Sequence, residues 1–231
     1  SCRRQRTCST DMRRLPLLLL ATTTLLVPPA QSAEFFTGLF PEAAITKRLE
    51  HGRSLTFKVE HQQIAYDRDD DPRRQFTHYR TDWMAFYGAK LSASNSVALG
   101  VFHRVQDGAN ANRLIQQFAT VMRLRTMRLA HRVRTDQTFT DGEDVALRLR
   151  YRLAAEVPLS GATLEPGENY LVVSNEPIFS VQSDDFEIEN RFVLTLGRLV
   201  TKDRKVELSV DYRADKFIQE GFRHRLWFKV G

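Results

Sequence analysis

The stretch from Val145 to Val157, VALRLRYRLAAEV, alternates between two chemically opposite faces. Apolar side chains such as Leu147 and Leu149 fill one parity, and Arg148 and Arg150 lie on the other. Such alternation predicts a β-strand rather than a helix, and at about 3.3 Å per residue the stretch is long enough to cross a bilayer when tilted. An apolar face of this height favours contact with lipid, whereas successive arginines need a wet or ion-paired interior.

The basic net charge of the chain is concentrated near its N-terminus. The sequence has 231 residues and a formal charge of +6, and five arginines against one aspartate before residue 34 account for +4 of that charge. The remaining 29 basic and 27 acidic residues nearly balance, which argues against a nucleic-acid-binding surface. Cys2 and Cys8 also lie in this leader, so the rest of the chain has no disulfide or thiolate chemistry.

The leader has the pattern of a secretory signal. Arg13 and Arg14 follow Met12, an apolar run extends over residues 15–27, and small residues end at Ala33. We therefore expect residues 1–33 to comprise upstream residues and a cleaved signal peptide, although a retained amphipathic segment is the alternative. Residues 34–52 are then a leader, a lumenal plug or an extra strand, and residues 53–231 form one β-barrel domain.

Alternating segments joined by short turns continue from Leu55 to Val230. They predict an all-β fold, a closed up-and-down antiparallel transmembrane β-barrel of about 10 strands (8–12). Since bacterial single-chain membrane barrels use even strand numbers, ten is favoured over eleven, with both ends of the ten-stranded chain segment on the periplasmic side. Outward loops are expected at Asp67 to Arg74, Asp107 to Asn112, Thr140 to Asp144, Val181 to Asp185 and Ile218 to Glu220.

The second half of the chain resembles a known but uncharacterised family. The resemblance is carried by the sequence RLIQQ from Arg113, by the arginine-rich residues 126–134, by the strand closing in Val157-Pro158-Leu159 and by Asn169-Tyr-Leu followed by Glu176. These features are similar to the outer-membrane β-barrels grouped as domain of unknown function 2490. Ala130 departs from the family, because a glutamate is expected there. The resemblance implies a fold and an outer-membrane location, and it implies no activity.

The candidate site is the charged parity of the strands. Guanidinium groups that recur about every 7 Å along one strand need carboxylates or bound anions nearby. One interpretation is a self-neutralised lumen packed by ion pairs, and the other is a narrow pore or site for anions. The residues expected to face this lumen are Arg128, Arg132, Arg134, Arg148, Arg150, Arg152, Glu156, Glu176, Glu187, Glu189, Arg191, Glu207, Asp211 and Arg213.

No catalytic or metal constellation is evident. The six histidines lack metal-ligand spacing, and we predict no metal site, no cofactor and no enzymatic activity. His78 and Asp82 share one parity and are the nearest approach to an oriented base, while Ser174 lies on the inward parity of another strand. Tyr79, Trp83 and other aromatic residues are expected in the interfacial girdles.

These patterns predict an outer-membrane barrel of a Gram-negative bacterium, either structural or a narrow conduit for small polar or anionic solutes. The expected partners are outer-membrane lipids and the barrel-assembly machinery, with no nucleic acid. The oligomeric state stays open. Two alternatives remain. An outer-membrane lipid-modifying enzyme would keep the orientation and add a catalytic site, whereas a soluble periplasmic lipid-binding barrel would turn the apolar parity inward.

Overall fold

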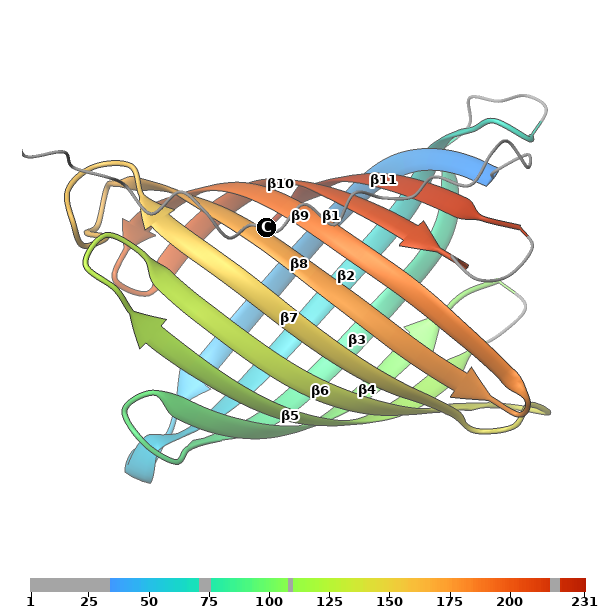
Figure 1. Cartoon of the computed structure of the whole chain (residues 1–231), viewed down its shortest axis with the longest axis horizontal. Helices are drawn as coiled ribbons and strands as arrows, with labels where there is room; N and C mark the ends of the chain where they lie inside the picture. The colour runs from blue at the N-terminus through green and yellow to red at the C-terminus, as the bar shows by residue number, and fades with distance from the viewer. Residues whose placement is uncertain (1–33, 71–75, 108–109, 217–220) are drawn as a thin grey trace, which may run out of the picture. The chain divides into compact units, whose positions relative to one another are not determined.

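The computed structural model describes residues 34–70, 76–107, 110–216 and 221–231, which belong to one compact unit. In this part of the chain, consecutive strands pair into a closed barrel (Figure 1). Its strands are β1 (Glu34–Arg48), β2 (Arg53–Asp67), β3 (Thr77–Lys90), β4 (Asn95–Val105), β5 (Ala111–Arg123), β6 (Arg128–Thr140), β7 (Ala146–Pro158), β8 (Asn169–Gln182), β9 (Asp185–Thr201), β10 (Arg204–Asp215) and β11 (Arg223–Val230). A single 3₁₀ turn, η1 (Glu50–Gly52), connects β1 to β2. The predicted signal peptide and the predicted loop at 218–220 lie outside the described residues, as do parts of the loops at 67–74 and 107–112.

The predicted all-β closed barrel is confirmed, but the preference for ten strands is wrong. The described residues form eleven strands, and the eleventh is β1, which occupies most of the segment at 34–52 that the sequence left open. β1 pairs with β2 in antiparallel fashion and with β11 in parallel fashion. An odd strand number requires one such parallel pair, and it places the start of β1 and the end of β11 at opposite ends of the barrel.

The parallel seam is held by an apolar cluster on the inner face. Phe36 and Phe40 of β1 pack edge-on against Trp227 of β11, with ring centroids 5.8 Å and 6.1 Å from its ring. Gly38 lies directly opposite Trp227 and leaves room for the indole, because a Cβ at Gly38 would be only 2.9 Å from that ring. Tyr79 packs against the same cluster and not in the outer girdle where the sequence placed it.

The two faces of the strands are oriented as the alternation predicts. In β7, the side chains of Leu147 and Leu149 are 53% and 48% exposed, whereas Arg150 is 8% exposed. The same division recurs around the barrel, where large apolar residues make up the outer surface of most strands. Within the described segments, no helix has the length and apolar character needed to cross a membrane.

The interior is not uniformly charged. A second apolar cluster, formed by Met84, Phe102 and Ile115 with Phe86 packed against it, lines the wall made by β3, β4 and β5. Arginine side chains lie over several of these inner aromatic rings, and the guanidinium carbon of Arg113 is 4.4 Å from the centroid of Phe102. Cation–π contacts of this kind join the apolar wall to the charged part of the lumen.

Candidate functional site

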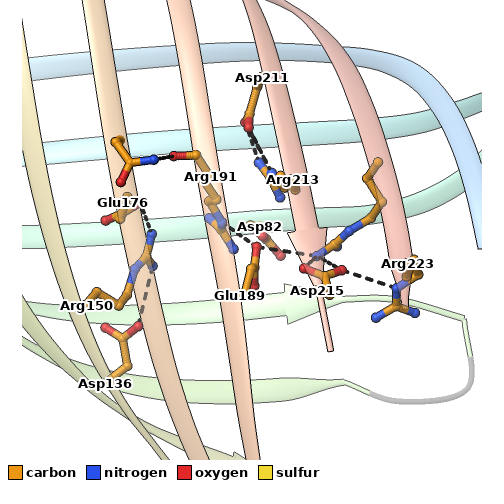
Figure 2. Close-up of polar contacts among 12 residues, drawn as sticks. Asp82, Asp136, Arg150, Glu176, Glu189, Arg191, Asp211, Arg213, Asp215 and Arg223 are labelled. Atoms are coloured by element: carbon orange, nitrogen blue, oxygen red, sulfur yellow. Dashed lines mark hydrogen bonds and ion pairs between the residues drawn. The ribbon is translucent and has the colours of Figure 1, made fainter. Parts of the chain in front are cut away.

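Three neighbouring strands, β6, β7 and β8, carry a continuous network of buried ion pairs. Asp136 accepts from Arg134 at 2.8 Å and from Arg150 at 3.5 Å. Arg150 also donates to Glu176 at 2.9 Å, and Glu176 accepts from Arg132 at 2.8 Å. Figure 2 shows Arg150 lying between the two carboxylates. The antiparallel register puts Arg134 beside Arg150, so these like charges are compensated by carboxylates rather than by separation.

A second network joins β9, β10 and β11. Glu189 accepts from Arg191 at 2.5 Å and from Arg225 at 3.4 Å. Arg225 and Arg223 both donate to Asp215, and the distance from Arg223 to Asp215 is 3.2 Å. Figure 2 shows that Glu189 and Asp215 lie close together, with guanidinium groups around them. Each carboxylate in this network therefore already serves two arginines.

Smaller ion-paired groups occupy the remaining walls. Asp82 of β3 accepts two hydrogen bonds from Arg104 of β4, both 2.8 Å long, in the bidentate geometry that makes arginine–carboxylate pairs strong. On β10, Asp211 and Arg213 pair at 2.7 Å and are both buried. Ion pairs thus line the inner wall on most sides.

The structure places the predicted lumen residues on the inner parity of β6 to β10. Eleven of the fourteen line a central cavity, namely Arg132, Arg134, Arg148, Arg150, Arg152, Glu176, Glu187, Glu189, Arg191, Asp211 and Arg213. The other three form polar contacts at one end of the barrel. Arg128 donates to Glu156 at 3.1 Å, and the Tyr170 hydroxyl donates to Glu207 at 2.7 Å.

Several charged lumen residues were missed by sequence reasoning. Asp136 has the same parity as Arg132 and Arg134, so its role could have been found by extending the alternation by one residue. Glu42, beside the β1 seam, had no such signal, because the segment around it does not alternate. The missed residues that line the cavity are Lys58, Glu60, Arg80, Asp82, Arg104, Arg113, Asp215, Arg223, Arg225 and Lys229. Asp136 and Glu42 join them through ion pairs.

The central cavity has a volume of about 890 Å³ and reaches both ends of the barrel. Arg48 and Gly52, next to the turn between β1 and β2, line it at one end, and Gln106 and Arg223 line it at the other. A cavity of this size agrees with the expectation that long side chains fill most of a small barrel.

The structure does not bring together His78 and Asp82, the two residues that the sequence suggested as an oriented base. Asp82 faces inward to Arg104, whereas the His78 Nε2 lies 3.1 Å from the Thr81 hydroxyl on the outer side of the sheet, so the pairing of His78 with Asp82 is wrong. Ser174 is buried on the inner face, as its parity predicted. In the segments described, no three His, Cys, Asp or Glu side chains are arranged to hold a metal ion.

A family model described as a protein of unknown function, DUF2490, matches residues 37–219. This match confirms the family that the sequence features suggested, and it extends the resemblance into the first half of the chain. No curated protein and no solved structure matches the chain.

Proposed function

Since the chain belongs to the DUF2490 family, whose description gives no function, we propose a function from the barrel itself. We propose that the protein is an outer-membrane β-barrel whose arginine-rich lumen is a narrow conduit for small anionic solutes. Its partners are then outer-membrane lipids and, during insertion, the barrel-assembly machinery. The observation that carries the proposal is an ion-paired cavity that reaches both ends of a barrel with an apolar outer surface.

The outer surface supports the membrane location. Leu194, near the middle of β9, is 42% exposed, and its neighbours across the sheet are Val173 and Val210. A soluble protein rarely exposes an apolar surface that surrounds the whole molecule, whereas a membrane barrel requires it. A soluble lipid-binding barrel needs the opposite orientation, with the apolar parity inside.

A matched pair of leucine substitutions tests this location. Leu194→Arg places a charge in the middle of the proposed lipid-facing belt, and Leu159→Arg places it in the turn after β7, where Leu159 is 54% exposed. In vesicles, Leu194→Arg should lower the folding free energy by about 2 to 4 kcal/mol, and Leu159→Arg by at most about 1 kcal/mol. Equal effects for the two variants, or release of the wild-type protein by carbonate alone, would contradict membrane insertion.

The lumen charge supports anions over cations. The inner faces of the described strands carry more arginine and lysine than aspartate and glutamate, and Arg113, Arg148 and Arg152 have no carboxylate at ion-pair distance within the described part of the chain. Uncompensated cations along a narrow path attract anions and repel cations.

Conductance in planar bilayers tests the conduit. Arg152→Glu inverts an unpaired charge that lines the cavity without removing a partner from any ion pair, and it should shift the reversal potential toward cation selectivity. Arg198→Glu makes the same charge change on an exposed residue whose parity is outward, and it should leave the selectivity unchanged. A selectivity that ignores Arg152→Glu would refute an arginine-lined conduit.

The buried ion pairs favour a second candidate, a purely structural barrel. Glu176, Asp136 and Glu189 each hold two guanidinium groups from the same or nearby strands, and such side-chain bridges fill space that a wide channel would need. The absence of any current from a folded, inserted protein would support this candidate and exclude the conduit.

A further inference from the structure

Two lumenal arginines, on either side of β6, have no carboxylate at ion-pair distance among the described residues. Arg113 of β5 lies opposite Thr138, and Arg148 of β7 lies opposite Asp136, two residues further along β6. Both side chains line the central cavity. Two inter-strand spacings and an offset of two residues place their backbones about 12 Å apart, which is a distance that two long side chains can close around a small ligand.

Arg113 is fixed in place but not neutralised. It is 5% exposed, its Nε donates to the Thr138 hydroxyl at 2.7 Å, and its guanidinium group lies over the ring of Phe102. These contacts orient the side chain and compensate none of its charge. The Thr138 hydroxyl accepts this bond and keeps its own proton to donate.

Arg148 is less well satisfied. Its Nε is buried and has no hydrogen-bond partner among the described residues. Two of the nearby carboxylates are occupied, because Asp136 is bound by Arg134 and Arg150, and Glu189 is bound by Arg191 and Arg225. A third, Glu187, lies in register with Arg148 across β8 but forms no ion pair with it.

The charge around these two residues is mixed, with arginines in the majority. Arg148 and Arg104 repel Arg113 while Asp136 attracts it, and Arg104 and Arg191 repel Arg148 while Glu189 attracts it. A buried charge without a partner destabilises a fold, so folded proteins normally supply an opposite charge from the chain or from a bound ion. Since no carboxylate among the described residues forms an ion pair with Arg113 or Arg148, the missing charge is expected to come from a ligand.

We propose that Arg113 and Arg148, with the Thr138 hydroxyl, bind a phosphate group in the lumen. Guanidinium groups match phosphate oxygens with two parallel hydrogen bonds, and a doubly charged phosphate balances two arginines where a single carboxylate balances one. The inference rests on the proposed conduit only for the route by which a solute enters. The phosphate comes either as a free solute or as the headgroup of a lipid.

Calorimetric titration of the full chain, folded in detergent, tests the site without requiring conduction. Inorganic phosphate is titrated into the wild type, Arg113→Gln, Arg148→Gln and Arg152→Gln, with chloride at matched ionic strength as the reference. Arg152 lines the same cavity, also has no carboxylate partner and lies four residues along β7 from Arg148, so it controls for the loss of one lumenal charge.

The wild type should bind phosphate, and Arg113→Gln and Arg148→Gln should each weaken binding by about tenfold or more, since each removes a charged hydrogen-bond donor. Arg152→Gln should change the affinity by less than about threefold. Without phosphate, Arg148→Gln should melt no lower than the wild type because it removes a repulsive charge, and this excludes misfolding as the cause of lost binding. Phosphate should raise the melting temperature of the wild type and of Arg152→Gln only.

A titration with lysophosphatidate distinguishes the two sources. Binding of inorganic phosphate assigns a free solute, and binding of lysophosphatidate alone assigns a lipid headgroup, provided that Arg148→Gln abolishes either one. Equal binding by Arg148→Gln and the wild type, or no binding of either probe, overturns this site while anion-selective current would still support the conduit. Binding at Arg148 without any current supports the site and rejects the conduit.

Discussion

Glu176 is the carboxylate whose loss should most clearly reveal the energetics of the lumen. It is 6% exposed and accepts charged hydrogen bonds from Arg132 and Arg150, at 2.8 Å and 2.9 Å. Hydrogen bonds to charged groups contribute about 1.5 to 3 kcal/mol each, so two of them set an upper range of about 3 to 6 kcal/mol. Glu176→Gln keeps the shape and one acceptor oxygen, but it removes the carboxylate that pairs with Arg132 and leaves Arg150 with only its 3.5 Å contact to Asp136. Removal of one member of a buried ion pair typically destabilises by 3 to 5 kcal/mol, and we therefore expect a loss of about 3 kcal/mol.

The measurement is reversible urea unfolding from vesicles, compared with the exposed pair between Arg48 and Asp203. Those side chains are 81% and 73% exposed, so Asp203→Asn should change the stability by less than about 0.5 kcal/mol. The double variant Glu176→Gln/Arg132→Gln should recover part of the loss, because it removes the cation that Glu176→Gln leaves without a carboxylate. A loss below about 1 kcal/mol for Glu176→Gln alone would show that water screens the network and would refute the view that the lumen depends on carboxylate pairing.

Two further predictions concern the wall. Gly197 of β9 should not tolerate a larger residue, because Tyr170 covers it so closely that a Cβ would be 2.2 Å from the Cζ atom of the ring. Gly197→Val should therefore destabilise the barrel by at least about 2 kcal/mol in the same unfolding assay. A smaller effect would show that the ring moves aside easily. The cysteine pair Leu39→Cys/Phe228→Cys should form a disulfide in the inserted barrel, because these residues are opposite each other across the β1–β11 seam. The control pair Leu39→Cys/Leu208→Cys should not, because Leu208 lies on β10, one strand further from β1. Equal oxidation of the two pairs would contradict β1 as a wall strand.

The sequence predicted the barrel and its charged lumen where each strand has one apolar and one polar face. β7 is the clearest case, since the parity of Leu147 and Arg148 alone assigns outside and inside. Sequence reasoning failed where the inner face is itself apolar. In β1, Phe36 and Phe40 point inward while Phe35 and Leu39 lie on the opposite parity, so both faces are apolar and no alternation appears.

The individual ion pairs could not be predicted for a different reason. Parity places a charge inside, but its partner depends on the register between strands and on side-chain reach. Glu187 and Glu189 share one parity of β9, yet Glu189 holds two arginines, whereas Glu187 forms no ion pair in the described part of the lumen. The same limitation applied to Arg113, whose lack of a carboxylate became visible only once β5, β6 and β7 were placed side by side.

The parallel seam shows how the interior compensates for an unusual closure. Parallel pairing is slightly less stable per residue than antiparallel pairing, and Pro41, which forms the last residue pair with β11, has no backbone N–H to donate. On the inner face, Glu42 accepts from Lys58 of β2 at 3.1 Å and from Lys229 of β11 at 2.9 Å, so one carboxylate bridges both neighbours of β1. The ammonium group of Lys229 also lies 4.4 Å from the centroid of Phe40. The apolar cluster around Trp227 and the ion pairs of Glu42 therefore stabilise the seam through side chains where the backbone hydrogen bonding is weakest. These contacts explain how a meander with an odd number of strands closes at β1.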